Sequence, residues 1–242
     1  MKHFLAALQF LTALPMGRSQ RFEPSKMVPF FPVVGLVLGG ILFLLDRGFL
    51  QLWSPETAAL LDVVALAALT GALHLDGLGD TADGLYGRRA PQEALAIMKD
   101  SRIGVMGLTA VVCCLALKWA GIAGLNSDRG LLLILVPAYA RCGILFGMRA
   151  LPYGRPEGGT GSAFFQRPPG MVAFWALVPL VALSVALGWR CLVLNGAFAV
   201  IAAAVLYFYH RKIGCITGDM LGGLTEILEA GLFLAVSAEV LP

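Results

Sequence analysis

Residues 74–107 read HLDGLGDTADGLYGRRAPQEALAIMKDSRIGVMG and lie between two long apolar runs. The first part of this stretch places Asp76, Asp80 and Asp83 at spacings of four and three residues. In a helix, this spacing puts all three carboxylates on one face. Like charges on one face repel each other, so we expect a cation to hold them. A divalent metal that prefers hard oxygen ligands is the natural candidate.

The composition of the chain predicts a membrane protein. Of its 242 residues, 58% are hydrophobic and 14% are charged, and the mean hydropathy is +0.81. A soluble domain has about 25% charged residues, so we predict an all-α, polytopic integral membrane helical bundle. No polar linker divides the chain, which predicts one domain over residues 1–242. The opening MKHFLAALQFLTALP favours a retained interfacial or short hairpin helix over a signal peptide, because its apolar part is short.

A helix needs about 20 mostly apolar residues to cross a bilayer, and the sequence predicts about seven such spans. They lie near residues 28–45, 57–73, 103–124, 131–150, 170–188, 192–209 and 221–241. Thirteen of the eighteen Lys and Arg residues fall in the loops on one side of this arrangement, and three fall on the other. Cytoplasmic loops carry an excess of these residues. We therefore expect the acidic stretch, the loop after the fourth span and the turn at residues 217–219 to face the cytoplasm.

Four carboxylates are candidate metal ligands: Asp76, Asp80, Asp83 and Asp219. Mg²⁺ is commonly bound by carboxylates together with water and substrate phosphates. Gly77, Gly79 and Gly84 remove side chains beside the first three acids, which we interpret as space for a phosphate ester near the backbone. The alternative is a solvated loop whose Asp side chains cap helices. Three acids on one face, directly after an apolar run, favour the metal.

A second charged group follows in the same stretch. Lys99 and Arg102 suit phosphate binding, because Lys supplies a point charge and Arg makes bidentate contacts. Asp100 is either a further metal ligand or the base that activates a hydroxyl. The alternative for Asp100 or Ser101 is an N-cap at the start of the next span. Arg155, in a loop rich in Gly and Pro, is another candidate anion contact, and a simple connecting turn is the alternative there.

Three further polar residues fall in or beside the apolar runs. Glu226 and Glu229 lie near the start of the last predicted span, and acids within a bilayer span are costly and often functional. The alternative is a salt bridge inside the bundle, with Arg141 as one partner, because the charge of Arg141 also lies within a span. His74 directly precedes the acids, and a lone His is more often an interfacial hydrogen-bonding residue than a ligand.

These motifs resemble those of the cobalamin synthase family, the adenosylcobinamide-GDP ribazoletransferases. The similar stretches are FLTALP at 10–15, PVVGLVLG at 32–39, GALHLDGLGDTADGLYG at 71–87, IMKDSRIGVMG at 97–107, PYGRPEG at 152–158 and TGDMLGGLTEILEA at 217–230. They span nearly the whole chain in the order of the family. The departures are slight and touch no charged residue: Gly79 and Gly154 stand where the family usually has Ala, and Val105-Met106 where it often has Thr-Phe.

The resemblance implies a Mg²⁺-dependent transferase in the cytoplasmic (inner) membrane of a bacterium or archaeon. A hydroxyl of α-ribazole, or of its 5′-phosphate, attacks the cobinamide-side phosphorus of adenosylcobinamide-GDP, and GMP leaves. With this chemistry we assign Asp76, Asp80, Asp83, Asp100 and Lys99 to catalysis, Arg102, Arg155 and Ser101 to substrate phosphates, and Asp76, Asp80, Asp83 and Asp219 to the metal. The expected partners are these substrates and the lipid bilayer, with no nucleic acid. A homo-oligomer is left open.

Two other functions fit parts of the pattern. CDP-alcohol phosphotransferases also set an Asp cluster at the cytoplasmic end of a helical bundle. This chain lacks their D-x-x-D-G-x-x-A-R pattern, because Asp76 and Asp80 are four residues apart and Leu85 and Tyr86 follow Gly84. A lipid-acting transferase of that kind would release CMP instead of GMP. A cation transporter would place its acids near the membrane midplane, whereas here they cluster at the ends of spans.

Overall fold

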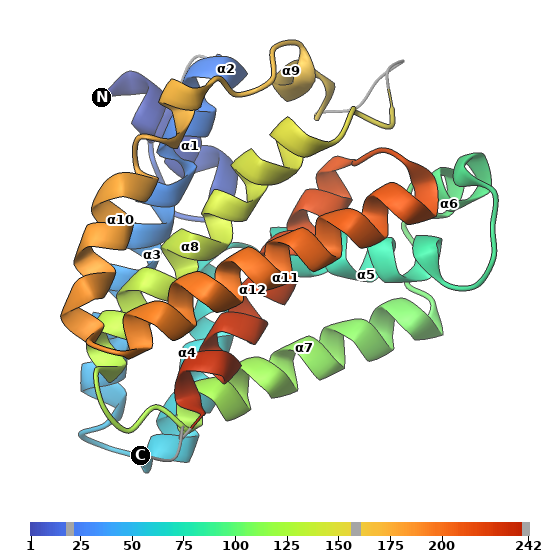
Figure 1. Cartoon of the computed structure of the whole chain (residues 1–242). Helices are drawn as coiled ribbons and strands as arrows, with labels where there is room; N and C mark the ends of the chain where they lie inside the picture. Colours follow the sequence, from blue (N-terminus) through green and yellow to red (C-terminus); the bar gives the residue numbers. More distant parts are fainter. Residues whose placement is uncertain (18–21, 156–160, 239–242) are drawn as a thin grey trace.

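The computed structural model describes residues 1–17, 22–155 and 161–238 (Figure 1). Its helices in chain order are α1 (Lys2–Leu11), α2 (Pro24–Met27), η1 (Val28–Phe30), α3 (Phe31–Phe49), α4 (Pro55–Leu69), α5 (Leu73–Leu85), α6 (Pro91–Ile97), α7 (Val105–Ala123), α8 (Arg129–Ala150), α9 (Ser162–Phe165), η2 (Met171–Phe174), α10 (Leu177–Ser184), η3 (Val185–Leu187), α11 (Arg190–Ile213) and α12 (Gly218–Ser237). The prediction of an all-α bundle is confirmed. Arg18, Arg21, residues 156–160 of the Gly/Pro-rich loop and the last residues of the seventh predicted span lie outside the described residues.

Five helices in the described part of the chain are long and apolar enough to cross a membrane: Pro24–Phe49, Val105–Ala123, Arg129–Ala150, Arg190–Ile213 and Gly218–Ser237. The chain is therefore a multi-pass membrane protein, with five such spans, or six if α4 and α5 together form one bent span, against about seven predicted. The predicted span at 170–188 is a shorter apolar segment, divided among η2, α10 and η3. The predicted span at 57–73 corresponds to α4, which has only 15 residues.

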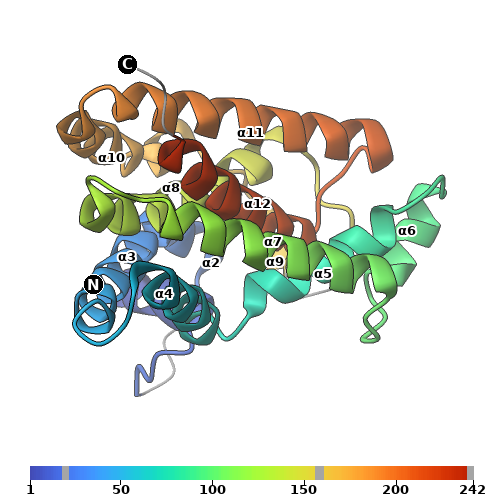
Figure 2. The same ribbon diagram turned by 90° about the horizontal axis from the view of Figure 1, so that it is seen from below.

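The break after α4 decides the direction of the acidic stretch. Gly71 and Ala72 both adopt left-handed backbone conformations, with φ of 58° and 56°. The axis of α5 is consequently bent by 89° from that of α4, so the two helices form at most one broken span. Gly adopts this conformation without steric cost, whereas Ala does not. The turn directs α5 across the bundle toward the start of α12 (Figure 2).

Helix α12 lies at the centre of the bundle and packs against α5, α7, α8 and α11 (Figures 1 and 2). Helix α8 also packs closely against α3. A Cβ atom on Gly35 would lie 2.5 Å from the Ala138 Cα, and one on Gly39 would lie 2.5 Å from the Ile134 carbonyl oxygen. These two glycines therefore let the backbones of α3 and α8 meet, as small residues do between membrane helices.

Local signals in the sequence set the ends of α11 and α12. Gly214 ends α11 in the left-handed conformation, with φ of 73°, which is the usual way for a helix to stop at glycine. Thr217 then begins α12, and its hydroxyl accepts a hydrogen bond of 3.2 Å from the backbone N–H of Met220. This N-cap satisfies one of the unpaired N–H groups at the start of α12, and it fixes the position of Asp219 in the first turn.

Candidate active site

The acidic stretch forms α5, as its spacing predicted, and meets the first turn of α12. At the crossing, a Cβ atom on Gly77 would lie 2.6 Å from the carbonyl oxygen of Asp219. The two backbones are therefore in direct contact, and only glycine fits at position 77. This contact brings the acids of α5 and Asp219 into one group, because Asp80 lies within electrostatic range of both Asp76 and Asp219.

Arg155 joins this group from a distant part of the chain. Residues Tyr153 and Ile216 form an isolated parallel bridge, in which the Gly154 N–H donates to the Ile216 carbonyl at 2.9 Å. The bridge holds Arg155 beside α12, where its Nη2 lies 2.9 Å from Oδ2 of Asp219. The predicted convergence of the acidic stretch, the Gly/Pro-rich loop and the 217–219 turn is thus observed in the structure. It places a guanidinium next to the carboxylates, as an anionic substrate would require.

Asp83 has a different set of partners. Its carboxylate oxygens accept hydrogen bonds from the backbone N–H groups of Gly104, at 2.6 Å, and Gly107, at 2.8 Å. These groups lie at the start of α7, where the N–H groups have no partners within the helix and the helix dipole favours a negative charge. Side chains at positions 104 and 107 would collide with this carboxylate. Asp83 therefore caps α7 from another helix, and neither Asp100 nor Ser101 provides a side-chain cap there.

The glycines of the acidic stretch serve helix packing. Gly77 contacts α12, and a Cβ atom on Gly84 would lie 2.5 Å from Cγ of Met98 and 2.9 Å from the Ala94 carbonyl oxygen on α6. Our interpretation that these two glycines leave space for a phosphate ester is wrong, because protein atoms fill that space. Gly79 differs, since a Cβ atom there would make only ordinary contacts at 3.7 Å.

The charged loop between α6 and α7 is exposed and forms an ion pair of its own. Arg102 donates to both carboxylate oxygens of Asp100, with Nε–Oδ1 at 3.0 Å and Nη2–Oδ2 at 2.5 Å. These hydrogen bonds lower the pKa of Asp100 to about 2, so its carboxylate is a weak base near neutral pH. Lys99 and Ser101 are exposed beside it. The loop adjoins α5 through Asp83, but the structure gives it no contact with Asp219 or Arg155.

A buried ionic network lies deeper in the bundle. Lys118 of α7 contacts Glu226 and Glu229 of α12, each at 2.6 Å. Arg141 of α8 donates to the other oxygen of Glu229. The expected pairing of Arg141 with a glutamate is confirmed, whereas the role of Lys118 was missed. Because buried charges are stable only when paired, this network ties α7 and α8 to the central helix and holds the two glutamates away from the site.

The donor set at the α5–α12 crossing fits a hard cation. Asp76, Asp80 and Asp219 offer carboxylate oxygens, and within the described part of the chain only Asp219 among them has a cationic partner at ion-pair distance. Among the residues that the structure describes, no three His, Cys, Asp or Glu side chains are close enough to hold one ion together. Mg²⁺ typically takes one or two protein carboxylates and completes its shell with water and substrate phosphates. The arrangement suits that mode of binding better than a closed protein cage.

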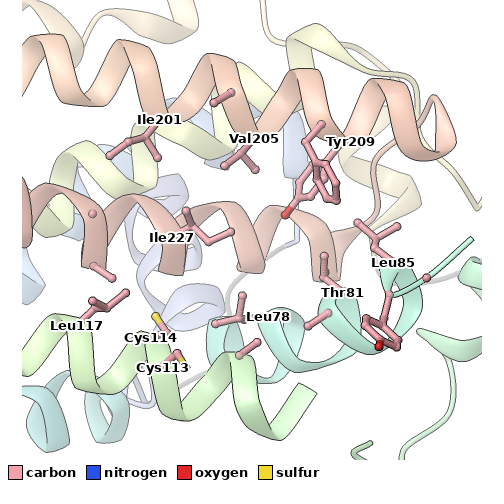
Figure 3. A pocket seen from close by; sticks show the side chains of 18 residues that line it. Leu78, Thr81, Leu85, Cys113, Cys114, Leu117, Ile201, Val205, Tyr209 and Ile227 are labelled. Carbon is pink, nitrogen blue, oxygen red and sulfur yellow. The ribbon is translucent and has the colours of Figure 1, made fainter. Parts of the chain in front are cut away.

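An aromatic-lined cavity of about 170 Å³ adjoins these acids and was not predicted from the sequence. Asp76 and Asp219 lie on one wall, and Phe10, Phe31 and Phe164 lie on another. The available signal was the FLTALP stretch at 10–15, which the resemblance included but to which no role was assigned. A larger, mostly apolar cavity of about 740 Å³ lies elsewhere, between α5, α7, α11 and α12 (Figure 3).

Comparisons with known proteins indicate the family to which the chain is similar. The family model described as cobalamin-5-phosphate synthase matches residues 3–237. A curated protein of Chlorobaculum tepidum, named adenosylcobinamide-GDP ribazoletransferase, is 39% identical over 95% of this chain and 92% of its own length. Proteins with the same name from Alkaliphilus metalliredigens and Pseudomonas putida are 38% and 37% identical, each over at least 95% of both chains. No solved structure matches the chain.

Proposed function

We propose, on the premise that the chain belongs to the cobalamin-5-phosphate synthase family, that it transfers cobinamide phosphate from adenosylcobinamide-GDP to ribazole. A hydroxyl oxygen of ribazole, or of its 5′-phosphate, forms a bond to the cobinamide-side phosphorus. The bond from that phosphorus to the bridging oxygen breaks, and GMP leaves with that oxygen. The product contains the nucleotide loop of cobalamin. The observation that carries the proposal is the family match over residues 3–237, a range that contains every residue assigned to the site.

The site residues suit the charges of this reaction. Both phosphates of the substrate are anionic, and Arg155 lies beside the carboxylates, where it can bind one of them. Asp76, Asp80 and Asp219 would hold Mg²⁺ together with phosphate oxygens. When bound, the metal neutralises charge that builds up on the phosphates and orients them. A carboxylate oxygen of Asp80 takes the proton of the attacking hydroxyl, because Asp100 is too weak a base for that role.

The remaining charged residues act around this centre. Asp83 positions the start of α7, and so sets the place of the loop that carries Lys99 and Arg102. These two exposed cations, with Ser101, contact the GDP portion of the substrate once it is bound. For this contact, Arg102 exchanges its bond to Asp100 for one to phosphate. We place the whole site on the cytoplasmic side of the inner membrane, because the Lys and Arg residues concentrate in the loops on that side.

Replacement of Asp80 by Asn tests the central assignment. With membrane insertion verified, we expect Asp80→Asn to lower the rate of GMP release by about 100-fold or more, as losses of a charge-stabilising group in an active site do. Added Mg²⁺ should recover part of that loss. Asp128→Asn is the matched control. Asp128 lies directly before α8, remote from the site, and pairs with Arg190 of α11. Full GMP release by the Asp80 variant at limiting Mg²⁺ would rule out this assignment.

A further inference from the structure

The aromatic-lined cavity beside the acids, called the chamber below, is formed by side chains from several segments of the chain. The rings of Phe10 and Phe164 have their centroids 4.9 Å apart, and those of Phe31 and Phe164 are 6.0 Å apart. The three rings come from α1, α3 and α9, so the chamber is assembled by segments far apart in the sequence. Phe165, which also lines the cavity, stacks on Tyr153, with the two ring centroids 4.7 Å apart. This stack connects the aromatic wall to the loop that holds Arg155.

His74 of α5 also contributes to the lining of the cavity. It is 3% exposed, and its Nδ1 atom has no hydrogen-bond partner among the residues that the structure describes. An unpaired polar atom in a buried position is costly. A ligand in the chamber that carries one complementary polar atom would remove that cost. The chamber therefore calls for a flat, mostly apolar molecule with few polar atoms.

The size and polarity of the chamber indicate which ring system of the two substrates it can hold. An apolar cavity of about 150 Å³ holds a benzene molecule, so a cavity of about 170 Å³ suits one small aromatic system and excludes a corrin ring. The carboxylates of Asp76 and Asp219 in the lining can accept from the N–H groups of guanine, but ionised carboxylates cannot donate to its O6 and N7 acceptors, which would need donors in a buried site. The benzimidazole base of ribazole has two fused rings and only one free ring nitrogen, which one His can satisfy.

We propose that this chamber binds the aromatic base of the ribazole acceptor, an inference that rests on the proposed function. The base stacks against Phe10 and Phe164, and its ring nitrogen pairs with His74. Its sugar then lies toward Asp76 and Asp219, on the wall where the hydroxyl must meet the phosphorus. The chamber thereby selects an acceptor with an apolar heteroaromatic base and orients its attacking hydroxyl.

Steady-state kinetics of Phe164→Leu in the full-length purified chain test the proposal. Leu keeps an apolar side chain but loses the ring, and stacking of a base on an aromatic ring is worth about 1–3 kcal/mol. We expect the KM for α-ribazole to rise about 10-fold, while the KM for adenosylcobinamide-GDP stays within about twofold of wild type. Phe22→Leu is the matched control, because the centroid of the Phe22 ring lies 5.4 Å from that of Phe164, but Phe22 does not line the cavity.

Other outcomes would overturn the proposal. If Phe164→Leu raised the KM for adenosylcobinamide-GDP alone, the chamber would hold part of that substrate instead. Equal changes in both KM values, or no change in either, would also contradict it. Equilibrium binding of α-ribazole to wild type and to Phe164→Leu separates this inference from the proposed function. Ring-dependent binding by a protein that releases no GMP would support the chamber and refute the proposed reaction.

A second inference comes from the larger cavity and does not depend on the first. Apolar side chains such as Leu117, Ile201 and Ile227 line it. Two of the helices that contribute, α7 and α11, are the least buried of the five candidate spans. Figure 3 shows the Tyr209 hydroxyl pointing into it, with Thr81 nearby on the α5 wall. Both hydroxyls are buried, and neither has a hydrogen-bond partner in residues 1–17, 22–155 or 161–238.

One basic side chain contacts a residue that lines this cavity. Lys212, at the end of α11, donates to the carbonyl of Gly87, which lines the cavity. Arg88 and Arg211 are exposed next to these two residues in sequence. An apolar groove that opens toward lipid and ends in a basic cluster matches the shape and charge of an anionic phospholipid. We infer that such a lipid occupies it, with an acyl chain along the groove, its ester oxygens near Tyr209 and Thr81, and its phosphate at Arg88 and Arg211.

Native mass spectrometry of the full chain tests this site, with phosphatidylglycerol and phosphatidylcholine of identical acyl chains as probes. We expect wild type to retain phosphatidylglycerol at least about threefold better, and Arg88→Gln/Arg211→Gln to lose that preference. Ala204→Trp, which fills the groove, should lower retention of both lipids. Arg149→Gln, at an exposed position on α8, should behave as wild type. Equal retention of the two lipids by wild type, or unchanged retention by Ala204→Trp, would overturn the inference.

Discussion

At the scale of single residues, the acids of α5 separate into two roles. Asp76 and Asp80 join Asp219 and Arg155 at one site, whereas both oxygens of Asp83 are taken by backbone N–H groups of α7. The spacing of these three residues showed that they share a face. It could not show that the partner of Asp83 lies more than 20 residues away, because that contact depends on how α5 and α7 pack.

Asp83→Asn should therefore lower stability. An Asn side chain keeps one oxygen acceptor but turns an NH₂ group toward the second backbone N–H, and it removes the charge that the start of α7 favours. We expect a loss of about 1–2 kcal/mol, which lowers the Tm by a few degrees. Thermal unfolding of the detergent-purified protein measures this loss of stability. Asp80→Asn is the control, and we expect its Tm to equal that of wild type. An unchanged Tm for Asp83→Asn would show that the cap contributes little.

The residues at the site were largely predictable, because acids, Lys and Arg in a strongly apolar chain are few and stand out. Their partners were less so. The ion pair of Arg102 with Asp100 removes the latter as a base, yet both residues fit a phosphate site when only the sequence is known. The aromatic chamber escaped prediction for the opposite reason. Phenylalanines such as Phe10 and Phe31 are ordinary components of membrane helices, so nothing in their pattern marks a binding wall.

At the scale of helices, the site depends on one close crossing. Helix α5 touches the backbone of α12 at Gly77, and the 89° break after α4 directs it there. The sequence predicted a span near residues 57–73 but not the bend at its end, because apolar composition carries no information about bends. A non-glycine residue in the left-handed conformation, Ala72, is likewise invisible to propensity. The positions of α7, α8, α11 and α12 were predictable, because each is a long apolar run bounded by charged or glycine residues.

The crossing gives a prediction with a close control. Gly77→Ala places a methyl group 2.6 Å from the Asp219 carbonyl oxygen, so α5 and α12 must separate. We expect about 10- to 100-fold lower activity, because a shift of about 1 Å in a catalytic group can cost that much. Gly79→Ala, two residues along the same helix, meets only ordinary contacts at 3.7 Å and should keep full activity. The rate of GMP release by the two variants tests this prediction. Equal rates would contradict the role given to the crossing of α5 and α12.

At the scale of the whole molecule, motifs from four parts of the chain gather at one end of the bundle. The structure joins the α5 acids, the loop before α7, Arg155 and the start of α12, whereas Asp46, Asp62 and Arg129 form a separate ion-paired cluster near the α3–α4 and α7–α8 connections. The excess of Lys and Arg on the side of the site follows the distribution of a cytoplasmic face. Sequence alone predicted this division, because it needed only the order of spans and loops.

The division predicts opposite accessibility for two introduced cysteines. Ser101→Cys lies in the exposed loop before α7, and Gln51→Cys lies in the exposed connection between α3 and α4. A membrane-impermeant maleimide should label Ser101→Cys in inside-out vesicles and Gln51→Cys in spheroplasts, each above the signal of the wild-type cysteines. These results would place residue 101 on the cytoplasmic side, as proposed above for the whole site. Labelling of Ser101→Cys from the outside would reverse the topology and contradict the cytoplasmic placement proposed for the site.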